Sequence, residues 1–177
     1  MLHFYKAEII DAENITKLVN SAYRGDASRK GWTTEADILE GLRTTTQDVA
    51  NVIKRADAFV LIGVLNDEVV ACMRCESCLL AGRKAAHFGM IAVKPGLQNK
   101  GHGKLLIKAA EAIAMREWRV VGFYLTVISI RHELIEFYER LGFQKTGEFK
   151  DFPNNPEMWQ PKIENLNLLY MAKLVGA

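Results

Sequence analysis

The sequence lacks a hydrophobic run long enough to cross a membrane. Its apolar stretch Ala58–Leu65 is far shorter than the about 20 residues that a transmembrane helix needs. The N-terminal segment carries Lys6, Glu8 and Asp11 where a secretory signal would be apolar, so no signal peptide is expected. We therefore expect a cytoplasmic protein that does not act at a membrane and whose thiols stay reduced.

A large excess of charge of either sign is also missing. The formal net charge of the 177 residues is +2, which argues against a surface dedicated to nucleic acid. Apolar residues make up 49% of the chain and charged residues 25%, an ordinary composition for a globular protein. The length suits one domain with a substantial core, so we expect residues 1–177 to form a single domain.

Cysteine is scarce, and all three cysteines lie in the stretch "CMRCESC". The spacing of Cys72, Cys75 and Cys78 begins a zinc or iron–sulfur pattern, but no fourth cysteine completes it. His87 could in principle be a fourth ligand. However, the segment has the composition of a strand, and alternation would place Cys75 on the face opposite to Cys72 and Cys78. We expect three reduced thiols and no metal site.

Hydrophobic periodicity predicts a chain in which strands and helices are mixed. The expected strands are 4–10, 58–65, 68–77, 85–93, 120–128, 144–149 and 166–174, and the expected helices are 11–23, 33–55, 98–118 and 132–141. The stretch 33–55 contains one helix or two, because Gly41 and three consecutive threonines weaken its middle. The strand–helix–strand passage over 85–128 implies a locally parallel pair of strands. The expected fold class is therefore mixed α/β.

The stretch "VKPGLQNKGHGKLL" (93–106) joins an expected strand to an expected helix and combines glycine with positive charge. It is not a Walker A loop, because His102 and Gly103 stand where a lysine and a hydroxyl residue are needed. It is not a dinucleotide fingerprint either, because Leu106 occupies the third glycine position. Glycines near a helix N-terminus still let main-chain N–H groups approach an anion. The stretch is thus either an anion-binding loop or an ordinary surface connection.

A pair of motifs decides between these alternatives. The pattern Gln98-x-x-Gly101-x-Gly103 opens one expected helix, and "FYERLGF" (137–143) ends the next. Together they resemble the Q/R-x-x-G-x-G/A motif and the Y-x-x-x-G-F signature of the GNAT superfamily of acyl-CoA-dependent N-acetyltransferases. The resemblance implies a single α+β domain whose mixed, mostly antiparallel central sheet is flanked by helices and is locally parallel beside the loop.

The resemblance also implies acetyl-CoA as the cosubstrate, with no metal. In the family the loop amides hold the pyrophosphate, which assigns this role to Gln98, Asn99, Lys100, Gly101, His102, Gly103 and Lys104. Main-chain groups of Ile91, Ala92 and Val93 would pair with the pantetheine arm like an added strand. A backbone N–H of the same strand would stabilise the carbonyl oxygen as it gains charge. The transfer is direct from thioester to amine, so no covalent cysteine is required.

Two residues are candidates for proton transfer. Tyr138 stands where many members of the family carry a general acid, although its position on the apolar face of a helix also suits a core tyrosine. His87 is the only ionisable residue on the strand before the loop, and alternation places it on the same face as Gly89, Ile91 and Val93. It is either the base that removes the ammonium proton or a structural histidine near a strand end.

One position departs from the family. Many relatives have an asparagine seven residues before the tyrosine, where this chain has Arg131. An arginine there could instead bind a CoA phosphate or an acidic group of the substrate.

Substrate selection in the family depends largely on the first two helices and their connection. Here this region offers Tyr23, Trp32, Glu35 and Arg43, which are either lining residues of a pocket or ordinary packing and surface residues. The function implied is transfer of an acetyl group to the primary amine of a small molecule. The alternatives are a protein or peptide N-acetyltransferase and a non-catalytic CoA-binding sensor. The last expected strand offers an edge for pairing across a homodimer.

Overall fold

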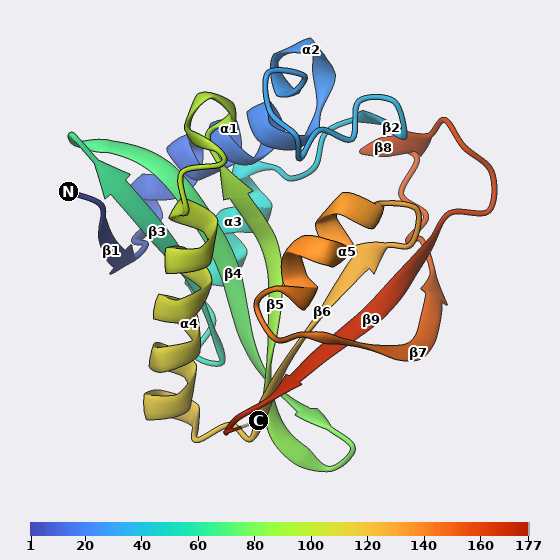
Figure 1. Cartoon of the computed structure of the whole chain (residues 1–177). Coiled ribbons are helices and arrows are strands. Elements are labelled where there is room, and N and C mark those ends of the chain that lie inside the picture. Colours follow the sequence, from blue (N-terminus) through green and yellow to red (C-terminus); the bar gives the residue numbers. More distant parts are fainter. Residues whose placement is uncertain (177) are drawn as a thin grey trace.

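A seven-stranded sheet forms the centre of the molecule in the computed structural model, which describes residues 1–176 (Figure 1). Along the sheet the strands are β1 (His3–Lys6), β3 (Ala58–Leu65), β4 (Glu68–Leu80), β5 (Arg83–Val93), β6 (Gly122–Ile128), β9 (Asn167–Leu174) and β7 (Gln144–Asp151). Every neighbouring pair is antiparallel except β5 and β6, which run parallel. The expected mixed, mostly antiparallel sheet, with its parallel pair beside the glycine-rich loop, is confirmed.

Helices cover both faces of this sheet (Figure 1). They are α1 (Ala12–Tyr23) and α3 (Thr46–Ile53) on one face, and α4 (His102–Trp118) and α5 (His132–Glu139) on the other. Ile15 and Val19 of α1 pack with Val60 of β3, while Leu106 of α4 lies in a cluster with Phe88 of β5. The apolar stripes that predicted the helices are thus the surfaces that they bury. Among residues 1–176, no helix is both long and apolar enough to cross a membrane.

The expected helix over 33–55 is wrong in its first half. Only Thr46–Ile53 is helical, and Thr45 caps this helix by accepting a hydrogen bond from the Asp48 N–H. Gly41 has a φ of +94°, which a right-handed helix does not contain. The segment Leu39–Gly41 is instead strand β2, which pairs with β8 (Trp159–Pro161) from the connection between β7 and β9. A contact between residues far apart in the sequence therefore overrides the local helical pattern.

Other boundaries also differ from the expected ones. The first strand ends at Lys6 and is followed by a 3₁₀ turn, Ile9–Asp11, and the polar break after α1 contains a short helix, α2 (Gly25–Ser28). A second 3₁₀ turn, Pro95–Leu97, follows β5. The helix expected from position 98 begins at His102, because Asn99 and Gly101 have φ values of +62° and +81°. The loop is therefore longer than the sequence predicts.

The last strand is not available for pairing across a dimer. Strand β9 lies between β6 and β7 and is hydrogen-bonded to both, so the expected dimer edge at this strand is wrong. The edge strands of the sheet are β1 and β7.

Strands β5 and β6 separate soon after they begin. Their pairing is limited to Ala86 with Phe123 and His87 with Tyr124. Beyond this point β5 has a bulge opposite β4, at which Met90 has a φ of +52°. Figure 1 shows the two strands diverging towards the end of β5 at which the loop to α4 begins. The bulge and the divergence leave the β6-facing side of β5 without a partner strand.

Candidate active site

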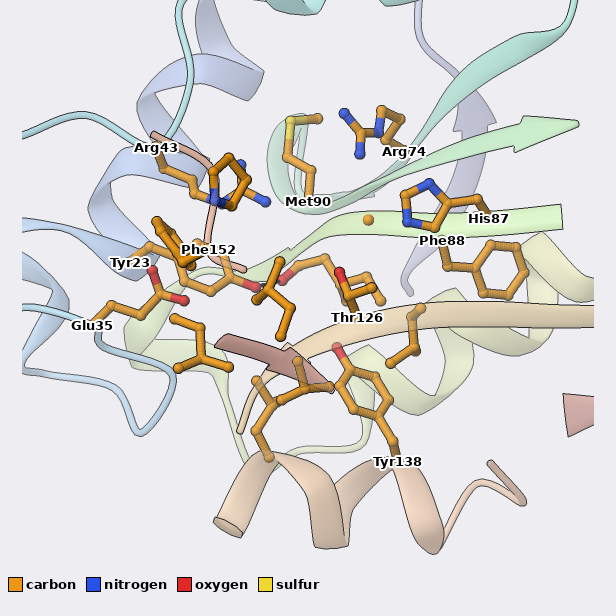
Figure 2. A pocket seen from close by; sticks show the side chains of 18 of the residues that line it. Tyr23, Glu35, Arg43, Arg74, His87, Phe88, Met90, Thr126, Tyr138 and Phe152 are labelled. Atoms are coloured by element: carbon orange, nitrogen blue, oxygen red, sulfur yellow. Dashed lines mark hydrogen bonds between the residues drawn. The ribbon is translucent and has the colours of Figure 1, made fainter. Parts of the chain in front are cut away.

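Two cavities lie where β5 and β6 separate. The larger has a volume of about 230 Å³ and is bounded by β4, β5, β6, the end of α1 and the segment after β7 (Figure 2). The smaller has a volume of about 90 Å³ and is bounded by the loop before α4 and by α5. The residues that line both cavities are Tyr23, Ile91, Leu134 and Tyr138. The cavities therefore share a wall, an arrangement that suits two substrates that react where they meet.

The loop before α4 has the geometry of an anion site. Asn99 and Gly101 both adopt left-handed backbone conformations, and α4 begins directly after Gly101. The first N–H groups of this helix have no partners within the helix and turn towards the loop. A Cβ atom added at Gly101 would meet no atom within 4 Å, so the space beside this backbone is open. Lys100 and Lys104 are exposed and add positive charge, and Lys104 lines the smaller cavity.

His102 adds an unsatisfied polar atom to the same loop. Its Nδ1 is buried and has no hydrogen-bond partner within residues 1–176. A Cβ atom at Gly103 would touch Phe137 at 3.5 Å and Val93 at 3.7 Å, which are ordinary contact distances. The residues present at the loop thus fit a phosphate-bearing group, with Gly101 providing the space and His102 an unused nitrogen.

Gln98 holds the loop in place and does not offer its side chain to a ligand. Its Oε1 accepts a hydrogen bond from the Trp32 N–H at 2.8 Å, and its Nε2 donates to Thr33 Oγ1 at 2.9 Å and to the Val93 carbonyl at 3.0 Å. A side chain at Gly31 would collide with this amide. All of these side-chain contacts are to protein, so the expected role of Gln98 at the pyrophosphate stays a prediction that concerns its main chain.

The three residues assigned to pantetheine do not share one environment. Ile91 and Val93 line the smaller cavity, whereas Ala92 is buried in the cluster beneath α1. The Ile91 carbonyl accepts a hydrogen bond from the Tyr23 hydroxyl, and the Val93 carbonyl accepts one from Gln98. Burial raises the pKa of Tyr23 above its usual range, so this phenol stays a donor. Main-chain groups of β5 face the cavity only at alternate residues.

Tyr138 lies on α5 between the two cavities. Only 5% of this residue is exposed, and its ring packs edge-on against Phe137 and Phe143. Figure 2 shows its hydroxyl directed from the helix into the larger cavity, towards Thr126. The hydroxyl has no hydrogen-bond partner in the part of the chain that the structure describes. Burial raises the pKa of the phenol well above its usual range, so Tyr138 remains protonated and can donate.

His87 lines the larger cavity from β5 and is held on two sides. Its ring stacks on Tyr124 with centroids 4.6 Å apart, and its Nδ1 lies 3.1 Å from Glu76 Oε2. Hydrogen bonding from His87, followed by the charge of Arg74 and hydrogen bonding from Arg55, lowers the pKa of Glu76 to about 2. Glu76 is therefore ionised and can accept a hydrogen bond from an N–H at Nδ1 of His87; in the tautomer that carries this proton, Nε2 is an acceptor.

Glu76 is a residue of the site that was not predicted from the sequence, although a signal for it was present. Glu76 and His87 are directly paired across the hairpin of β4 and β5. The hairpin turn around Gly82 was visible in the sequence, but a one-residue change in its position would have moved Glu76 to another partner.

The candidate substrate residues divide between the two cavities. Tyr23, Glu35 and Arg43 line the larger cavity, whereas Trp32 lines the smaller one, and its ring centroid lies 5.6 Å from that of Phe137. Trp32 therefore lies beside the loop before α4, and its role in substrate binding stays a prediction.

Glu35 and Arg131 form part of a buried ionic network. Glu35 pairs with Arg24, and its other oxygen lies 3.8 Å from Arg131 Nη1. Arg131 also donates to the main-chain oxygens of Thr33 and Trp32 and contacts Glu133 at 3.1 Å. Its side chain is only 4% exposed. Its guanidinium thus holds the segment before β2, and a contact of Arg131 with a CoA phosphate or an acidic substrate stays a prediction.

The cysteines lie outside the candidate chemistry. Cys72 packs beneath α1 and Cys75 packs on the α4 side of the sheet, so the expected placement on opposite faces is confirmed. Burial raises the pKa of Cys72 to about 12. Within residues 1–176, no group of three or more His, Cys, Asp or Glu side chains is arranged to hold a metal ion.

Comparison with known proteins identifies the family. The profile of the Acetyltransferase (GNAT) family matches residues 13–143, most of the chain, and the protein therefore belongs to this family. The family uses acetyl-CoA as its cosubstrate and acts on amines of small molecules or of proteins. A comparison with curated proteins found no match.

Several solved structures share the fold. The ribosomal-protein-S18-alanine N-acetyltransferase from Escherichia coli superimposes with a TM-score of 0.70 at 16% identity, covering 100% of this chain and 96% of that one. An N-acetyltransferase from Staphylococcus aureus Mu50 gives a TM-score of 0.72 at 14% identity, with coverages of 98% and 97%. A chimera of the spermidine N-acetyltransferase SpeG from Vibrio cholerae and hSSAT gives 0.69 at 16% identity, with coverages of 98% and 95%. These likenesses establish the fold and leave the acceptor open.

Proposed function

We propose that this protein transfers the acetyl group of acetyl-CoA to the primary amine of a small molecule. The observation that carries the proposal is the meeting of two cavities at Tyr138 and Ile91. The smaller cavity adjoins the anion-binding loop, and the larger adjoins the only histidine of β5. Binding both substrates in contact would supply the orientation that a two-substrate transfer requires.

The loop and β5 would bind the cosubstrate. Acetyl-CoA supplies the acetyl group as a thioester when it is bound. The first N–H groups of α4, with Lys100 and Lys104, would hold the pyrophosphate, and the β6-facing main chain of β5 near Ile91 and Val93 would hold the pantetheine arm. A main-chain N–H of this segment would stabilise the oxygen that gains charge during transfer.

His87 and Tyr138 would move the protons. Nε2 of His87 accepts a proton from the ammonium group directly or through water, while Glu76 keeps the imidazole oriented through Nδ1. The amine nitrogen then bonds to the acetyl carbon as the carbon–sulfur bond breaks. Tyr138 donates its proton to the departing sulfur, which leaves as a thiol, and the second proton lost by the amine nitrogen returns to the Tyr138 oxygen directly or through water. Every protein group needed for these reaction steps lines one of the two cavities or contacts a residue that lines one.

The walls of the larger cavity favour a small acceptor over a peptide. The connection from β7 to β9 carries Phe152 and Trp159 over this cavity, and strand β8 fastens that connection to β2. Both aromatic residues pack in a cluster with Ile38 and Leu39. A peptide chain would have to displace this connection, whereas a small amine need not.

The test is an assay of thiol release from acetyl-CoA over a diverse panel of primary amines. Changing Tyr138 to Phe should lower kcat by about 10²- to 10⁴-fold with little change in CoA affinity, because only the proton donor is removed. Tyr5→Phe is the matched control, since Tyr5 is 53% exposed on an edge strand and is expected to leave the rate unchanged. A wild-type protein that binds CoA but acetylates no amine would instead support a CoA-binding sensor.

A further inference from the structure

The larger cavity contains positive charge that no carboxylate neutralises. Arg43 lies over the Tyr23 ring at 5.9 Å, and its guanidinium has neither an ion-pair partner nor a side-chain hydrogen bond within residues 1–176. Lys150 lines the same cavity from β7, its Nζ lies over the Tyr170 ring at 5.7 Å, and it forms no ion pair among residues 1–176. A cavity with such walls attracts an anionic group and repels a cationic one.

Arg74 adds a second guanidinium with unused donors. Its Nε lies 3.2 Å from Glu76 Oε2 but is not aligned for a hydrogen bond, and this buried nitrogen has no partner in the described structure. Burial is the main cause that lowers the pKa of Arg74 below its usual range, and repulsion from Arg43 and Arg55 lowers this pKa further. Arg43 and Arg74 both line the larger cavity, and Figure 2 shows both on the side of it opposite to Tyr138.

The carboxylate of Glu35, which lines the same cavity, does not offset these charges. Glu35 is buried and already paired with Arg24 and close to Arg131. Both of its oxygens therefore already have guanidinium partners other than Arg43 and Arg74, and a buried ion pair of this kind is strongly destabilised when one partner is removed.

Gly89 on β5 provides the room that Arg74 needs. A Cβ atom at this position would lie 2.8 Å from Arg74 Nη2. Any other residue would therefore push the end of the flexible arginine side chain aside. The guanidinium reaches the cavity wall across the backbone of β5 because position 89 has no side chain.

We propose that the larger cavity selects primary amines that carry a carboxylate, held by Arg43 and Arg74. Figure 2 shows both arginines across the cavity from Tyr138, so a molecule whose carboxylate they bind would extend its amine towards the junction of the two cavities. Paired guanidinium groups match the two oxygens of a carboxylate. A cavity of about 230 Å³ suits a molecule the size of an amino acid. This inference rests on the proposed acetyl transfer and names its acceptor class.

The experiment compares matched amines that differ only in charge. Glycine, γ-aminobutyrate and phenylalanine are each assayed against their own amides, with spermidine and O-phosphoethanolamine as cationic and phosphate-bearing alternatives. The acid of the preferred pair is expected to exceed its amide in kcat/KM by at least roughly 10-fold. Preference for the amides or for spermidine overturns the proposal, and preference for O-phosphoethanolamine overturns the assignment to a carboxylate.

Variants then identify the residues responsible. R43Q and R74Q should each lower kcat/KM for the acid by roughly 10- to 100-fold, and for the amide by less than about 3-fold, because only the acid loses a charged contact. R43K and R74K should recover part of the loss, and G89A should act like R74Q without removing any charge. R116Q is the matched control, since Arg116 is exposed at the end of α4. Equal losses for acid and amide overturn the proposal.

A binding measurement separates failure of this inference from failure of the proposed function. If no amine is acetylated, calorimetric titration of the acids and amides into the protein with CoA still reports selection in the cavity. Binding of an acid that R43Q abolishes supports the inference although the proposed reaction has failed. Equal binding of acid and amide, or binding of neither, overturns the inference.

Discussion

Changing Glu76 to glutamine removes a negative charge that three neighbouring side chains contact. Glu76 contacts His87 at 3.1 Å and Arg74 at 3.2 Å, and it pairs with Arg55 as well. Its side chain is 17% exposed, so solvent screens these contacts only partly. The glutamine keeps the shape of the side chain, and the variant therefore reports on the charge alone.

The size of the effect follows from the pKa of Glu76, which is lowered from 4.5 to about 2. At about 1.4 kcal/mol for each tenfold change in proton affinity, the carboxylate contributes about 3–4 kcal/mol to the free energy of unfolding at neutral pH. Because folding lowers this pKa, the contribution is complete above the unfolded value of 4.5 and is lost as the pH falls towards about 2.

Urea unfolding of the wild type and of Glu76→Gln, followed by circular dichroism at several pH values between about 7 and 3, measures this contribution. The difference between the two proteins should be largest at neutral pH and should shrink below about pH 4.5. The matched control is Glu13→Gln, since Glu13 forms an exposed pair with Lys17 on α1 and should show no measurable change. A difference that stays constant down to pH 3, or that is absent at pH 7, would refute the assigned role of Glu76.

Three further predictions concern other parts of the molecule. Gly101→Glu should raise the Kd for CoA by at least roughly 100-fold in calorimetric titration, because a carboxylate would occupy the anion site. Gly82→Glu is the control: Gly82 is another left-handed glycine with open space beside it, and this change should leave the Kd for CoA unaltered. Gly41→Ala should lower the free energy of unfolding, measured in urea, by at least about 2 kcal/mol, because the new Cβ would collide with the Met158 carbonyl and the φ of residue 41 is +94°. Gly96→Ala is the control, since a Cβ at position 96 would lie in open space and should have little effect. Iodoacetamide should alkylate Cys78 in the native protein before Cys72 and Cys75, because burial raises the pKa of Cys72 and Cys75 more than that of Cys78. Mass spectrometry measures the order of labelling, and labelling of Cys72 first in the native protein would contradict this prediction.

The parts of the fold that the sequence predicted are those determined by local pattern. The stripe on α4, the apolar run of β3 and the short helix that carries Tyr138 each appear within a single window of sequence. The loop before α4 was recognised because its glycines permit backbone conformations that few other residues adopt. These features need no knowledge of distant residues.

The parts that were not predicted depend on distant contacts. Local periodicity favoured a helix at Leu39, but this residue pairs with Pro161 in a sheet of two strands. The charge of Arg131 suggested a ligand, but its position is set by carbonyl groups of Trp32 and Thr33 about a hundred residues earlier in the chain. No window of sequence contains both partners of such a contact.

The segment from Gly31 to Glu35 joins the two halves of the site. Trp32 and Thr33 form hydrogen bonds with Gln98 of the loop before α4, and their carbonyl oxygens accept hydrogen bonds from Arg131 at the start of α5. Glu35, at the other end of the segment, lines the larger cavity. The position occupied by asparagine in many relatives therefore has a different use here. Arg131 fixes one segment against both the loop that would bind CoA and the helix that carries Tyr138. The same buried guanidinium therefore fixes the positions of the two cavities relative to each other.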